Sequence, residues 1–99
     1  MLLYCVTLLV SNLICSVPEE PGLVQGERIV VGEVDALVAA CRGSRATWIL
    51  VSNEVGLGVV PPNSLGRSYR DALGRANQRL AAAADEVLFL VAGLPLRLK

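Results

Sequence analysis

The stretch Val51–Lys99 reads VSNEVGLGVVPPNSLGRSYRDALGRANQRLAAAADEVLFLVAGLPLRLK. Its two adjacent prolines, at 61 and 62, end the structure before them, and an Asn or Ser directly afterwards can cap a helix. Apolar residues then recur at helical spacing, which predicts a helix over 63–84. The continuous apolar run Val87–Ala92 predicts a strand, because it is short and rich in large aliphatic residues.

The residues before this stretch alternate in the same way. Leu2–Cys5 predicts a short strand and Val6–Cys15 an apolar helix. Prolines, acidic residues and a glycine predict a loop over 16–25, and the apolar spacing of Gly26–Arg42 predicts an amphipathic helix. The run Thr47–Val51 is typical of a strand covered on both faces. Strands alternating with helices predict an α/β fold with a parallel sheet.

Composition limits what a chain of this size can be. With 99 residues it forms one domain at most. Its apolar fraction of 54% exceeds the roughly 45–50% of ordinary domains, which predicts faces that other polypeptide covers. The net charge of zero gives no support for nucleic acid or an anionic membrane as a partner.

The uncharged start Met1–Val17 allows two interpretations. It lacks a basic start, is shorter than the roughly 20 apolar residues of a membrane span, and is interrupted by Ser11 and Asn12. A buried strand and helix of a cytoplasmic protein is therefore favoured over a targeting segment. Cys5, Cys15 and Cys41 predict reduced, largely buried thiols and no metal site, because the chain has no histidine and no CxxC pair.

Candidate site residues follow the covered strand. Asn53 and Glu54 come at its carboxyl end, where open parallel sheets bind ligands. They predict either contact with a nucleotide hydroxyl or a metal-bound water, or simple capping of the turn. Gly56 and Gly58 predict a flexible lid or a plain turn, since no GK(S/T) follows to make a phosphate loop.

The long helix supplies a second group. Arg67 and Arg70 lie in its first two turns, where guanidinium groups can hold phosphate oxygens. A solvated helix face explains the same two residues. Asn77 and Gln78, further along the helix, are candidates for hydrogen bonds across a subunit or domain interface.

Several short segments together carry a family resemblance. They are NEVG at 53–56 with GVVP at 58–61, Arg70-Asp71 with Gly74, NQRLA at 77–81, ADEV at 84–87 and GLP at 93–95, with a weaker likeness at Leu2–Leu13. This pattern resembles the C-terminal half of the bifunctional adenosylcobinamide kinase / adenosylcobinamide-phosphate guanylyltransferase family. The resemblance implies a P-loop NTPase (RecA-like) three-layer α/β fold. Residues 1–99 would be one partial domain, truncated so that the N-terminal phosphate-loop half is missing.

The resemblance also implies a function in cobalamin biosynthesis. Members phosphorylate adenosylcobinamide and then transfer GMP to adenosylcobinamide phosphate, using GTP or ATP with magnesium, and they assemble as homotrimers. By this resemblance Asn53, Glu54, Arg67 and Arg70 become candidate nucleotide-binding residues, and Gly56 and Gly58 residues of a structural turn.

The chain departs from the family in the groups that perform the chemistry. It has no histidine to carry GMP, and its one lysine is Lys99, so no phosphate-loop lysine is present and no catalytic residue is expected in this chain. Tyr4 stands where the family has an acidic residue that contacts nucleotide or magnesium. Decay of the site or a start codon placed inside a longer reading frame would each explain this difference. The alternative function is a catalytically inactive fragment or a small assembly domain.

Overall fold

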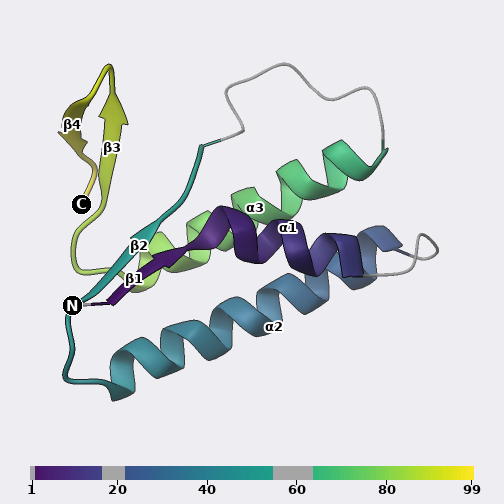
Figure 1. Cartoon of the computed structure of the whole chain (residues 1–99), viewed down its shortest axis with the longest axis horizontal. Helices are drawn as coiled ribbons and strands as arrows, with labels where there is room; N and C mark the ends of the chain where they lie inside the picture. Colours follow the sequence, from purple (N-terminus) through teal and green to yellow (C-terminus); the bar gives the residue numbers. More distant parts are fainter. Residues whose placement is uncertain (1, 17–21, 55–63) are drawn as a thin grey trace.

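The computed structural model describes residues 2–16, 22–54 and 64–99. Four strands and three helices occur in these ranges (Figure 1). In chain order they are β1 (Leu2–Cys5), α1 (Val6–Ser16), α2 (Gly22–Gly43), β2 (Trp48–Val51), α3 (Ser64–Ala83), β3 (Leu88–Val91) and β4 (Leu94–Arg97). Each predicted helix and strand has a counterpart at nearly the same position.

The first two strands form a parallel pair. Leu3 is in register with Ile49 and Cys5 with Val51, so both strands point the same way. Parallel neighbours need a long crossover, and α1 and α2 provide it here. The α/β prediction is confirmed for this part of the chain.

The third strand was predicted wrongly as a member of the same parallel sheet. β3 pairs with β4 in a separate antiparallel sheet, with Leu90 opposite Pro95. The reason is the two-residue turn between them, where Ala92 and Gly93 have φ angles of 52° and 76°. Positive φ at both turn positions is the geometry of a type I′ turn, which folds the chain directly back on itself.

The predicted loop over 16–25 is also partly wrong. Ser16 is the last residue of α1, and α2 already begins at Gly22. Residues 17–21 lie outside the described ranges. The apolar pair Leu23 and Val24 continues the spacing of the following helix, so helix formation there outweighs the local turn chemistry. The helix ends at Gly43, as predicted.

The buried core lies between the three helices. α2 packs along α3, and α1 contacts both. The fully buried side chains include Val6 and Val10 of α1, Val30 and Val34 of α2, and Leu73 of α3. Arg79 of α3 also pairs with Asp35 of α2 at 3.4 Å, on the exposed side of the same contact. On α3, Leu73, Ala76 and Leu80 are buried in this core.

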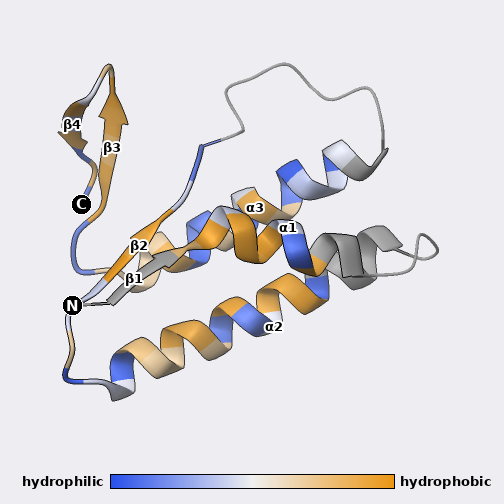
Figure 2. Ribbon diagram, viewed as in Figure 1, coloured by the Kyte–Doolittle hydropathy of each residue, from blue (hydrophilic) through white to orange (hydrophobic). Residues whose placement is uncertain are grey.

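The strands are much less covered than the sequence predicted. In β2, Leu50 packs against the helical core, whereas Ile49 and Val51 are 38% and 49% exposed. Figure 2 shows that β2 and the hairpin are strongly apolar along their lengths. In the described residues helices therefore cover one face of these strands at most. The prediction of strands covered on both faces is wrong for this chain.

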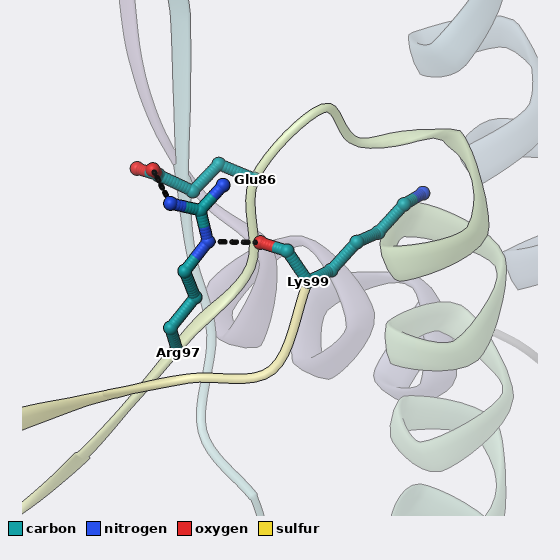
Figure 3. Close-up of polar contacts among 3 residues, drawn as sticks. All are labelled: Glu86, Arg97 and Lys99. Atoms are coloured by element: carbon teal, nitrogen blue, oxygen red, sulfur yellow. Dashed lines mark hydrogen bonds and ion pairs between the residues drawn. The ribbon is translucent and has the colours of Figure 1, made fainter.

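Polar contacts attach the base of the hairpin to α3. Lys99 Nζ donates to the carbonyl oxygens of Ala81 and Ala82, each at 3.0 Å. Arg97 Nε donates to the carbonyl oxygen of Lys99 at 3.1 Å, and its guanidinium pairs with Glu86 at 3.8 Å (Figure 3). A cation at the end of a helix satisfies its last carbonyls and complements its dipole. Lys99 thus caps α3 and holds the chain that follows β4.

Candidate functional site

A broad, open hollow lies between the end of β2, one side of α3 and the base of the hairpin. Asn53, Glu54 and Arg70 all line it. Asn53 and Glu54 reach it because β2 ends at Val51 and the chain leaves the sheet there. Arg70 reaches it from the second turn of α3. Three of the residues selected from the sequence therefore line the same broad hollow.

The other candidates are placed differently. Arg67 is exposed and is not among the residues that line the hollow, whereas Arg70 is half-buried. Gly56 and Gly58 lie outside the described residues. Tyr4 belongs to β1, where it is in register with Leu50, but its side chain is not among those described. The described site therefore has two polar residues after β2 and one arginine of the predicted pair.

Further residues of α3 line the hollow that sequence reasoning did not select. Asp71 and Arg75 add an acid and a second guanidinium, and Gly74 between them carries no side chain. A Cβ built on Gly74 would meet no atom within 4 Å, so the wall is open at this point. The sequence does contain a pattern that could have identified these residues. Positions 67, 70, 71, 74, 75 and 78 recur at helical spacing and therefore fall on one side of a helix.

Asn77 joins α3 to the segment that follows β2. Ser52 Oγ donates to Asn77 Oδ1 at 2.6 Å, and Asn77 Nδ2 donates to the carbonyl oxygen of Asn53 at 3.0 Å. The sequence suggested an intersubunit or interdomain role for Asn77, but in the structure it bonds within the chain. The two partners are 25 and 24 residues away from Asn77, and no local pattern reports such a pairing.

The half-buried indole of Trp48 also lines the hollow. Trp48 Nε1 is inaccessible to solvent and has no hydrogen-bond partner in the part of the chain that the structure describes. A buried donor without a partner lowers folding stability by about 1–3 kcal/mol. An acceptor that bonded to this atom would therefore stabilise the folded chain. Trp48 Nε1 is thus an unused buried donor within the described residues.

Tyr69 packs against the core, and Cys5 and Cys41 are the cysteines whose side chains are described. Burial raises the pKa of the Tyr69 phenol above its ordinary value, and the negative charge of an ionised Cys5 raises it further. Cys5 and Cys41 are free thiols, as predicted, but Cys5 is exposed where burial was expected. Its position at the end of β1, beyond the helical core, explains this. The side chain of Cys15 is not among those described.

The described residues contain neither a metal-binding group nor a membrane-spanning helix. No group of three or more His, Cys, Asp or Glu side chains there is placed to hold a metal ion. None of the helices described combines the length and the apolar character that crossing a membrane requires.

The parallel β1–β2 pair, with polar residues beyond the end of β2, defines an α/β protein with a candidate ligand site. Residues 1–98 match the family model for cobinamide kinase / cobinamide phosphate guanyltransferase. The chain belongs to this family, and the recognition made from its sequence motifs is confirmed.

Similarity to curated proteins supports the same family assignment. The chain is 46% identical over 103 residues to the bifunctional adenosylcobalamin biosynthesis protein CobU of Salmonella typhimurium, and 43% identical to that of Escherichia coli. It is 40% identical over 99 residues to CobP of Pseudomonas aeruginosa. These matches cover 99–100% of the chain but 53–57% of the relatives. The chain thus spans about half the length of the curated relatives that it matches.

Proposed function

We propose that this chain forms part of an enzyme of cobalamin biosynthesis that phosphorylates adenosylcobinamide and transfers GMP to the product. The hollow beside α3 would be its contribution to the nucleotide site. The observation that carries this proposal is that Asn53, Glu54 and Arg70 line one hollow in a member of the cobinamide kinase / cobinamide phosphate guanyltransferase family.

Each of these side chains suits a different part of a nucleotide. The Arg70 guanidinium offers several parallel donors to phosphate oxygens. Glu54 accepts hydrogen bonds from a ribose hydroxyl or from a water, and Asn53 both donates and accepts. Arg67, outside the hollow, is proposed only as a contact that a longer phosphate chain would reach. Gly56 and Gly58 remain proposed turn residues.

The expected nucleotide is GTP or ATP with Mg²⁺. Magnesium bound to a nucleotide uses one or two protein carboxylates together with phosphate oxygens and water, so Glu54 fits this role in part. The bound ion would neutralise phosphate charge during transfer. The absence of a three-ligand group in the described residues is compatible with this, because most of the ligands would come from phosphate and water.

The remaining catalytic groups would come from polypeptide outside these 99 residues. The chain has no histidine to carry GMP and no lysine except Lys99, which caps α3. We therefore propose that it is a partial domain of a three-layer P-loop fold acting in the cytoplasm, inactive by itself. Adenosylcobinamide, nucleotide and further copies of the chain are its proposed partners.

A chimera tests this proposal. The chain would replace the matching 57% of the Salmonella typhimurium relative, and phosphate transfer from GTP to adenosylcobinamide would be measured. We expect activity, with losses of at least about tenfold in Glu54→Gln and Arg70→Ala, because each removes a direct charge-assisted contact. Glu33→Gln and Arg45→Ala are matched controls, since both residues are exposed and outside the hollow. An active chimera indifferent to Glu54 and Arg70 would refute the site.

The exposed apolar strands support a second candidate, a non-catalytic assembly domain. Leu90 and Leu94 are 63% and 71% exposed, which is unusual for residues of this type. Translation of the DNA upstream of Met1 separates the two candidates. A GxxxxGKS loop and a histidine in the same reading frame favour the enzyme, and their absence favours the assembly domain.

A further inference from the structure

The segment Ser52–Glu54 has no regular secondary structure, yet it carries two of the candidate ligand contacts. It follows β2 directly and precedes residues that lie outside the described ranges. A loop in this position needs a contact to the rest of the fold if its side chains are to keep one orientation. In this chain such a contact comes from α3.

Both ends of one carboxamide make that contact. Asn77 Oδ1 accepts from Ser52 Oγ at 2.6 Å, and Asn77 Nδ2 donates to the Asn53 carbonyl oxygen at 3.0 Å. Because the two bonds go to adjacent residues, they fix the direction of the chain as well as its distance from α3. Asn77 is half-buried and lies in the last third of α3, a 20-residue helix.

We propose that Asn77 is a positioning residue for the nucleotide site: its carboxamide holds Ser52–Glu54 against α3, so that Glu54 is presented to the hollow before any ligand binds. The expected effect on nucleotide binding rests on the proposed function. The two hydrogen bonds of Asn77 that hold Ser52–Glu54, called the clamp below, do not depend on it. Pre-organisation of this kind raises affinity because the ordering of the loop is not required at the moment of binding.

Three substitutions distinguish the contributions of the two hydrogen bonds that Asn77 makes. Asn77→Ala removes both, and alanine favours helix more than asparagine, so α3 itself is not weakened. Asn77→Asp keeps the acceptor for Ser52 but turns a second oxygen toward the Asn53 carbonyl. Ser52→Ala removes only the bond to Oδ1. Asn12→Ala, an exposed asparagine of α1, is the matched control.

The first measurement is ¹⁵N relaxation of the backbone in the full chain without nucleotide. We expect order parameters of about 0.85 at Ser52–Glu54 in the wild type and in Asn12→Ala, falling below about 0.6 in Asn77→Ala and Asn77→Asp. Ser52→Ala should give an intermediate value. Unchanged order parameters in both Asn77 variants would overturn the proposal.

The second measurement is titration of the same samples with magnesium and GTP, followed by the amide shifts of Ser52–Glu54. We expect weak saturable shifts in the wild type and at least about tenfold weaker binding in Asn77→Ala. If the wild type shows no shift, nucleotide binding by these 99 residues alone is refuted and the chimera decides the nucleotide site, while the relaxation data still decide whether Asn77 holds Ser52–Glu54. If binding is equal in the wild type and Asn77→Ala, the positioning role is refuted even though the nucleotide site stands.

Discussion

The helical cluster and the β3–β4 hairpin are both rich in aliphatic residues, but their side chains have opposite environments. Val6, Val30 and Leu73 in the cluster are fully buried, whereas Leu90 and Leu94 in the hairpin are 63% and 71% exposed. The difference shows that apolar character predicts a need for burial and does not tell which surface supplies it. In the cluster, helices of the same chain supply it.

The largest expected effect is in the cluster. Leu73→Ala should lower the free energy of unfolding by about 2–5 kcal/mol, because it leaves a cavity among α1, α2 and α3. Leu94→Ala, the same change at an exposed hairpin position, should change it by less than about 0.5 kcal/mol. Chemical denaturation monitored by circular dichroism measures both. Equal losses would show that another surface already covers the hairpin in solution.

The next effect concerns the attachment of the hairpin to α3. Lys99→Met keeps most of the side-chain length but removes the donors to Ala81 and Ala82, at a cost of about 1 kcal/mol. Amide exchange at Val87 and Leu98 should become several-fold faster, since their backbone bonds close the base of the hairpin. Arg45→Met, an exposed cation in the segment before β2, is the control. Exchange unaffected by Lys99→Met would mean that the cap does not hold the hairpin.

A smaller change in the opposite direction is expected at the turn. Ala92 has a φ of 52°, which costs a residue with a Cβ about 1 kcal/mol. Ala92→Asn should slow amide exchange in β3 and β4 a few-fold, because Asn-Gly is the preferred pair in this turn. Gly93→Ala should accelerate it through backbone strain alone, since an added Cβ meets no atom within 4 Å. Effects of the same sign would contradict the turn geometry.

The smallest effect is a pH dependence in the cluster. Burial raises the pKa of Tyr69, so the native state keeps its phenolic proton at a pH where the unfolded chain loses it. The stability that depends on this proton is present below about pH 10 and is lost as the pH rises from there through the higher native pKa. Unfolding free energies measured across this range should fall more steeply in the wild type than in Tyr69→Phe. Identical slopes would show that Tyr69 titrates normally.

Sequence reasoning succeeded for most of the elements, and the site residues that it selected stay a prediction. Helical spacing placed α1 and α3 within a residue or two of their observed ends, and strand composition located β1 and β2. It missed the early start of α2, because local proline and glycine signals were given more weight than apolar spacing. For the site it selected Asn53, Glu54 and Arg70, but it did not predict the bonds that Asn77 makes within the chain. Local patterns report periodicity, and they carry no information on which distant side chains meet.

The sequence by itself determined the family, the order of the elements and the absence of a histidine, because each of these is written in residue identities and their spacing. Only the tertiary structure decided that β3 turns back into its own antiparallel sheet, that the strands keep exposed apolar faces, and that Asn77 joins α3 to the end of β2. The last two results depend on packing between segments far apart in the chain, and their energies come from contacts that no single stretch of sequence contains. The hairpin is local, but its turn is defined by the positive φ angles of Ala92 and Gly93, which only the structure shows.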